Sequence, residues 1–216
     1  LALRARDITG EGQVVDVALY ESMFRLLDEL VPAYGAKQII RERMGAGTAT
    51  VVPHSHYPTG DGRWVAIACT TDRIFARLAH VMERPELATP DKFERMAERL
   101  AHRREVDDAV SQWTLSMPLA EVTAACDTAQ VPCGPVYAIN EIFEDPHYKE
   151  RGNLLTVQDE RVGELTMSNV VPRLCATPGA VNWLGPMLGE HTDEVLGSLL
   201  GVSKGQLAEL RSAHVI

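Results

Sequence analysis

Gly10-Glu-Gly-Gln-Val-Val-Asp-Val-Ala-Leu-Tyr-Glu21 is the stretch of sequence that decides the fold. Its two glycines predict a turn, and the valines that follow predict a short β-strand over Gln13–Val17. An amphipathic helix is predicted from Ala18 onward, with apolar positions at Met23, Leu26, Leu27 and Leu30. A strand this short needs neighbours in a sheet. Because the residues before it offer only a frayed helix and a turn, we expect those neighbours to come from later in the chain, from another chain or from a part outside this sequence.

The composition is that of an ordinary acidic globular protein. The chain has 216 residues, 45% of them hydrophobic and 24% charged, and a formal net charge of −9. That charge argues against a nucleic-acid partner, which needs a basic patch, and no apolar run approaches the roughly 20 residues of a membrane helix. We therefore expect a cytoplasmic protein with neither a nucleic-acid nor a membrane partner. The cysteines form no C-x-x-C pair, so we interpret them as small apolar residues in a reducing compartment.

The first half of the chain predicts a helical segment, a flexible loop and a second domain. Pro32 is predicted to end or kink the first helix, and a second helix is predicted over residues 33–43. The small residues that follow predict a linker or flexible loop. Gly60-Asp-Gly62 predicts a turn between two β-type runs, the second over Trp64–Cys69. Helices are then predicted over about 72–83, from Thr89-Pro90-Asp91 onward, over 106–117 with a solvated junction at 102–105 before it, and over 118–129.

The second half predicts an edge strand, a hairpin and two closing helices. Two prolines within Val131–Tyr137 exclude a central strand and favour an extended edge strand. A short helix over residues 140–144 is followed by strands at Leu154–Val157 and Glu164–Met167. Residues 170–186 predict an extended connector, and helices are predicted over 192–200 and 203–212. Ser203 and Gln206 fit a capping box.

This order of elements predicts an α/β protein in which a second domain interrupts the first. Residues 1–43 would belong to the large domain, 44–52 would be a linker, and 53–155 would form a small domain of a hairpin plus helices. Residues 156–186 would provide strands and a connector, and residues 187–216 would return to the large domain as helices.

No self-contained catalytic constellation is visible in the sequence. His54 and His56 share a face if the chain is extended there, but a metal site needs a third ligand and none is nearby. Asp16 between two valines suits a structural role, and Glu190-His191-Thr192 suits the capping of a helix. Cys133 would be a nucleophile only with a base beside it. Gly10-Glu-Gly12 precedes its strand and lacks a third glycine, so it is no dinucleotide loop.

Five motifs in register resemble the family III CoA transferases, the group that includes formyl-CoA transferase, carnitine CoA transferase and the 2-methylacyl-CoA racemases. Each motif alone is weak, and together they span residues 10–216. They are Gly10–Glu21, Tyr57–Ala68, Val131–Val136, Asp145–His147 and Leu188–Leu196.

The resemblance implies the C-terminal half of an interlocked-dimer enzyme, with Rossmann-like large-domain pieces at both ends and an inserted small α+β domain. It implies coenzyme A as acyl-CoA substrate, a carboxylic acid acceptor and no metal. The partner would be a second copy of the chain or the N-terminal half of the same enzyme. The nucleophilic aspartate of such enzymes lies upstream of the Gly10 turn, so no catalytic residue is expected in this chain. Substrate contacts are expected at Gly45, Gly47, His54, His56 and Tyr57, where a small-domain loop covers the site.

Two alternatives remain open from the sequence. Racemases similar to this chain place a glutamate after the hairpin, where this chain has Thr70 and Thr71, which favours a transferase. The other alternative is a non-catalytic subunit or fragment that acts only in assembly.

Overall fold

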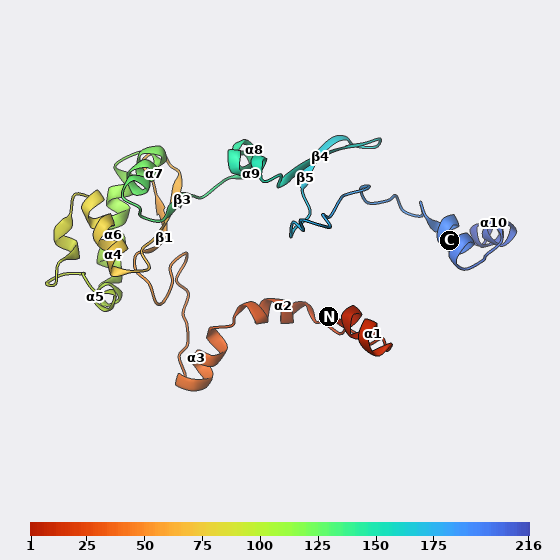
Figure 1. Cartoon of the computed structure of the whole chain (residues 1–216), viewed down its shortest axis with the longest axis horizontal. Coiled ribbons are helices and arrows are strands. Elements are labelled where there is room, and N and C mark those ends of the chain that lie inside the picture. Colours follow the sequence, from red (N-terminus) through yellow and green to blue (C-terminus); the bar gives the residue numbers. More distant parts are fainter. The chain divides into compact units, whose positions relative to one another are not determined.

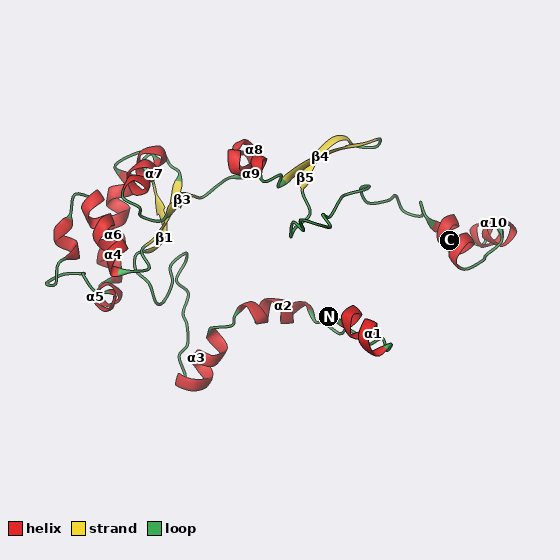
Figure 2. Ribbon diagram, in the orientation of Figure 1, coloured by secondary structure: helices red, strands yellow, loops and turns green.

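The computed structural model describes residues 1–216 as two compact units, Leu1–Val136 and Tyr137–Ile216 (Figure 1). Helices and strands occur in both units (Figure 2), so the predicted mixed α/β class is confirmed. No helix has the length and apolar character needed to cross a membrane.

The N-terminal segment consists of three helices, α1 (Ala2–Thr9), α2 (Leu19–Leu26) and α3 (Leu30–Lys37). The strand predicted over Gln13–Val17 is not formed, because no strand in the chain pairs with it and a single strand leaves its backbone groups without partners. No residue between positions 1 and 43 is buried. Large apolar side chains are exposed to solvent here, including Val14 at 93% and Leu26 at 76% exposure. This segment presents an apolar surface with nothing in its own unit to cover it.

Pro32 does not separate two helices as predicted. It lies in the first turn of α3, where the missing proline N–H would have had no helical partner in any case. The helix ends at Lys37 rather than at Arg43, because Gln38 adopts a left-handed conformation with φ of 53°. The Gln38 N–H then donates to the Tyr34 carbonyl oxygen at 2.8 Å and closes the helix.

A three-stranded antiparallel sheet forms the centre of the small-domain region. Its strands are β1 (His54–Pro58), β2 (Trp64–Ala68) and β3 (Cys133–Pro135), in the order β1-β2-β3. Ala66 lies opposite His56 on one side and Gly134 on the other. The predicted hairpin over Gly60–Gly62 and the predicted edge strand are both confirmed.

Helices cover one side of this sheet (Figure 1). They are α4 (Asp72–Val81), a short 3-10 helix η1 (Pro85–Ala88), α5 (Met96–Ala101), α6 (Arg103–Leu115) and α7 (Leu119–Thr128). The buried apolar side chains of this core all lie between Val52 and Val131. The region therefore has a complete hydrophobic core of its own, built from the hairpin, these helices and the edge strand.

Two helix starts in this region differ from the prediction. The helix predicted from Thr89 begins only at Met96, because residues 89–94 form a turn in which the Phe93 N–H donates to the Leu87 carbonyl at 3.0 Å. That turn carries Phe93 into the core at 4% exposure. The next helix starts at Arg103 rather than at 106, so the charged run is its first turn and not a junction.

Gly60 marks a close approach between the hairpin and the end of α6. A Cβ atom at this position would lie 2.8 Å from the Leu115 carbonyl oxygen. We expect Gly60→Ala to lower the free energy of unfolding by about 2 kcal/mol, because overpacking against backbone forces it to shift. Urea unfolding followed by tryptophan fluorescence measures this. Gly134→Ala is the matched control, since nothing lies within 4 Å of its added Cβ; equal costs at both positions would contradict the prediction.

The second unit contains α8 (Ile139–Glu144), α9 (Pro146–Glu150), β4 (Leu154–Asp159), β5 (Gly163–Ser168), a π-helical turn η2 (Glu194–Leu199) and α10 (Lys204–Ser212). The predicted hairpin of β4 and β5 is confirmed, with Leu154 opposite Ser168. So is the capping box, in which Ser203 Oγ accepts from the Gln206 N–H at 3.3 Å. Residues 170–186 hold no helix or strand, as expected of a connector. The assignment of residues 53–155 to one small domain stays a prediction.

Candidate functional site

The candidate site is a hollow on the side of the β1-β2-β3 sheet that faces away from the helices. Strand alternation sends Tyr57, Val65 and Ile67 into the core, where each is at most 3% exposed. The alternate residues therefore point to the opposite face. They are His54 and His56 on β1, Ala66 and Ala68 on β2, and Gly134 on β3. Together with Ala46 they line a hollow of about 310 Å³.

His54 is the most unusual side chain in this hollow. Its Nδ1 atom is buried and has no hydrogen-bond partner in the chain, the one buried side-chain nitrogen or oxygen of the structure in that condition. A buried polar atom without a partner costs free energy, so native proteins rarely retain one without a reason. His56, two residues along the same face, is exposed.

Two arginines hold the segment that leads into His54. Arg99 is fully buried, and its Nε donates to the Val52 carbonyl at 2.7 Å. The same guanidinium donates to the Phe93 and Glu94 carbonyls and to Asp72 Oδ1, at 2.9, 2.8 and 2.8 Å. Arg103 Nη2 donates to the Thr48 carbonyl at 2.7 Å. The loop before β1 is therefore fixed at Thr48 and Val52, which sets the position of His54.

Of the five residues expected to contact substrate, two, His54 and His56, line this hollow. Gly45 makes a turn with φ of 63°, and the Gly47 N–H donates to the Met44 carbonyl at 3.2 Å. Between them, Ala46 lines the hollow beside both histidines. Tyr57 lies on the other face of β1, and its hydroxyl donates to Asp107 Oδ1 at 2.6 Å. Burial and the Asp107 carboxylate raise the pKa of Tyr57 far above its ordinary value, so this residue supports the sheet from the core side.

Cys133 packs as the sequence indicated. Its side chain accepts a hydrogen bond from the buried Cys126 thiol, which lowers the pKa of Cys133 and raises that of Cys126. Burial raises the pKa of Cys69 to about 12. The chain holds no group of three or more ligating side chains placed to bind a metal ion.

The sequence did not predict the small residues that line the hollow or the arginines that fix the loop beside it. Ala66, Ala68 and Gly134 carry no chemistry of their own, but their small size creates the space. The alternation of small and large residues in Trp64-Val-Ala-Ile-Ala68 is the pattern that would have shown it. Arg99 could not be distinguished in the sequence from the exposed arginines around it.

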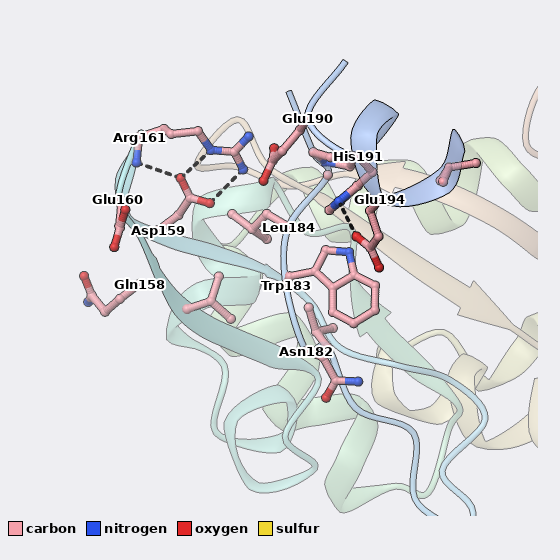
Figure 3. A pocket seen from close by; sticks show the side chains of 15 residues that line it. Gln158, Asp159, Glu160, Arg161, Asn182, Trp183, Leu184, Glu190, His191 and Glu194 are labelled. Atoms are coloured by element: carbon pink, nitrogen blue, oxygen red, sulfur yellow. Dashed lines mark hydrogen bonds and ion pairs between the residues drawn. The ribbon is translucent and has the colours of Figure 1, made fainter. Parts of the chain in front are cut away.

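A second hollow, of about 770 Å³, lies in the other unit beside the turn between β4 and β5. Figure 3 shows Arg161 facing the Asp159 carboxylate and His191 beside Glu194. Arg161 binds both Asp159 oxygens, at 3.0 and 2.8 Å, and holds the pKa of that carboxyl well below its usual range. Glu190 accepts from the Met187 backbone N–H at 2.6 Å. The Asp159–Arg161 and Glu190–Met187 contacts are local and close turns of the chain.

Comparison with known proteins gives a consistent result. Residues 1–192 match the model of CoA-transferase family III. Over 216 residues the chain is 48% identical to the succinyl-CoA–L-malate CoA-transferase alpha subunit of Chloroflexus aurantiacus, covering all of this chain and 50% of that protein. It is 42% identical to the succinyl-CoA–D-citramalate CoA-transferase of the same organism, covering all of this chain and 54% of that protein.

The structural comparison agrees with the sequence comparison. A crystal structure of a CaiB/BaiF family protein from Brucella suis matches with a TM-score of 0.74 and 26% identity, over 91% of this chain and 50% of that one. The chain thus spans about half the length of the relatives it matches. With the family model matched over 192 of its 216 positions, the chain belongs to CoA-transferase family III.

Proposed function

We propose that this chain is the C-terminal half of an enzyme that transfers coenzyme A from an acyl-CoA to a carboxylic acid. The observation that carries the proposal is the combination of half-length similarity with the uncovered apolar surface of residues 1–43. A segment with no buried residue and with Val14 and Leu26 in solvent suits an interface. The N-terminal half of the same enzyme, or a second, interlocked copy of the protein, would cover it and supply strands beside Gln13–Val17 in a Rossmann-like domain.

The chemistry proposed for the assembled enzyme divides one acyl exchange into easier steps. An aspartate carboxylate in the N-terminal half attacks the thioester carbon, and the CoA thiolate leaves as a mixed anhydride forms. The thiolate then attacks the aspartyl carbonyl, which releases the donor acid and leaves an aspartyl-CoA thioester. The acceptor carboxylate repeats these steps in reverse. This chain would contribute the Gly45–Gly47 loop, His54 and His56 to the substrate site, with Tyr57 supporting them, and the loop would exclude water from the anhydride.

The proposed substrates are dicarboxylic acids. The two relatives named above carry succinyl-CoA with L-malate or D-citramalate in their names, and all of these acids have two carboxyl groups. The racemase alternative receives no support from the site, because the Thr71 hydroxyl caps α4 by accepting from the Ile74 N–H at 3.3 Å. No carboxylate stands at Thr70 or Thr71 to support a catalytic histidine.

Complementation tests the proposed function. The purified chain is expected to show no CoA transfer alone, because it lacks the nucleophile. Co-expression with the N-terminal half of the Chloroflexus aurantiacus alpha subunit is expected to give succinyl transfer from succinyl-CoA to L-malate, measured by chromatography of the CoA thioesters.

Two controls make that result specific. The same N-terminal half expressed alone should be inactive, and replacing its candidate nucleophilic aspartate by asparagine should abolish the activity of the pair. Turnover by residues 1–216 alone would refute the half-enzyme proposal. A stable but inactive pair would favour the non-catalytic subunit instead.

A further inference from the structure

We propose that Arg103 is a positioning residue of the enzyme. Its guanidinium holds the Gly45–Gly47 loop in place over the reaction site, and without it water competes with the acceptor acid for the acyl intermediates. This inference rests on the proposed function, in which the loop excludes water from the anhydride. Arg103 acts through the loop and contacts neither the acid nor CoA.

The loop fixes its own shape but not its own position. The Gly47 N–H closes a turn on the Met44 carbonyl at 3.2 Å, and Thr48 Oγ1 donates to the Val51 carbonyl at 3.3 Å. Both of these hydrogen bonds lie within residues 44–51, and Gly45 at the turn is exposed. The position of the loop on the domain therefore depends on a contact that comes from outside it.

Arg103 provides that contact. Its Nη2 atom donates to the Thr48 carbonyl at 2.7 Å. Its Nη1 atom lies against the backbone of the preceding residue, since a Cβ atom added at Gly47 would be 3.7 Å from it. Asp107, one helical turn further along, accepts from the Tyr57 hydroxyl at 2.6 Å. One guanidinium thus meets two successive residues of the loop.

This contact can be removed without loss of the core. Arg103 is the first residue of α6, which packs into the core through Val106, at 1% exposure. The Arg103 side chain itself is only half-buried. Arg99 holds the Val52 carbonyl independently, so the chain from Val52 onward keeps its place when Arg103 is replaced. Residues 44–51 are then free to move away from α6.

Proteolysis of the full chain tests whether Arg103 holds the loop. Elastase cleaves after small residues such as Ala46 and Ala49, and cleavage of a folded chain follows the population in which the segment is open. We expect Arg103→Met to raise the rate of cleavage at these two bonds by about tenfold or more, the effect of one hydrogen bond from a charged donor. Mass spectrometry locates the cuts.

Arg104→Met is the matched control for the proteolysis. Arg104 lies next to Arg103 in the first turn of α6, and its side chain is exposed. We expect this variant to be cleaved at the wild-type rate. The urea midpoint reported by Trp64 and Trp113 should change little in either variant, because neither side chain belongs to the core.

The complemented pair tests the consequence for the reaction, with succinyl-CoA and L-malate as substrates. When water attacks an acyl carbon of the anhydride, its C–O bond breaks and succinate and the aspartate carboxylate are released. The protons pass to the CoA thiolate and to water, so CoA ends as the free thiol instead of L-malyl-CoA. We expect Arg103→Met to raise the ratio of free CoA to L-malyl-CoA by about tenfold or more, measured by chromatography, and Arg104→Met to leave it unchanged. A residue that only stabilises the fold would lower both products together.

Three results would overturn this inference while the wild-type pair still transfers CoA. Unchanged cleavage in Arg103→Met would show that Arg103 does not hold the loop. Faster cleavage with an unchanged product ratio would show that the loop position does not control water. A large fall in the urea midpoint would make Arg103 a residue of the core. A wild-type pair that forms no L-malyl-CoA refutes the proposed function instead, and the cleavage rates still decide whether Arg103 holds the loop.

Discussion

Replacing Arg99 with methionine is expected to lower the free energy of unfolding of the small-domain region by about 3–5 kcal/mol, the range found when one partner of a buried ionic network is removed. The Val52, Phe93 and Glu94 carbonyls would lose their shared donor inside the protein. Methionine fills much of the space of the arginine stem but donates no hydrogen bond. The cation also lies 4.6 Å from the centroid of the Phe75 ring, and that contact disappears with it. Urea unfolding followed by tryptophan fluorescence measures the change.

Arg95→Met is the matched control for this experiment. Arg95 also lies near Asp72, at 4.0 Å, but its side chain is 74% exposed. Exposed ion pairs contribute little, so we expect a change of at most about 0.5 kcal/mol. If both substitutions cost the same, Arg99 does not organise the core in the way described above.

Deleting residues 1–43 is expected to leave the stability of the core unchanged and to abolish complementation. None of these residues is buried, so the urea midpoint reported by Trp64 and Trp113 should stay unchanged. CoA transfer by the pair with the N-terminal half of the Chloroflexus aurantiacus subunit should fall to the background of the assay, because the segment proposed as the interface is gone. Self-association of the isolated chain, measured by light scattering, should fall as well, since exposed side chains such as Val14, Leu19 and Leu26 are removed with it.

A lower urea midpoint in the truncated chain would show that this segment packs on the small-domain core. Full activity of the truncated pair would show that residues 1–43 are not the interface. A monodisperse, cooperative monomer of the full chain would also contradict the assignment, because the apolar surface would then be covered within the chain itself.

The parts of the fold that local sequence rules decide were predicted well. Gly60-Asp-Gly62 gave the hairpin, the prolines of residues 131–137 gave an edge strand, and Ser203 with Gln206 gave the last capping box. Each depends on backbone chemistry within a few residues. The errors occurred where the outcome depends on distant partners. Gln13–Val17 has the composition of a strand but no strand in this chain to pair with, and the helix predicted from Thr89 is delayed because Phe93 is drawn into the core.

In the candidate site, too, features set by local sequence could be predicted, and features set by packing could not. His54 and His56 could be placed on one face from their spacing alone, and the loop of residues 45–47 was expected beside them. The same alternation puts Tyr57 on the core side, although it was grouped with the histidines. The buried state of Nδ1 and the anchoring of the loop by Arg99 and Arg103 depend on three-dimensional packing, so no local pattern in the sequence indicates them.

The three small residues that line the hollow, Ala66, Ala68 and Gly134, all lie on the side of the sheet away from the core. Ala66 and Ala68 alternate along β2 with Val65 and Ile67, which belong to the core. A methyl group added at Ala66, Ala68 or Gly134 would shorten the hollow without touching the packed side of the sheet. If the hollow holds the acid, as proposed, a change of acid needs substitutions only at these three positions, and the β1-β2-β3 sheet then lets specificity evolve separately from stability.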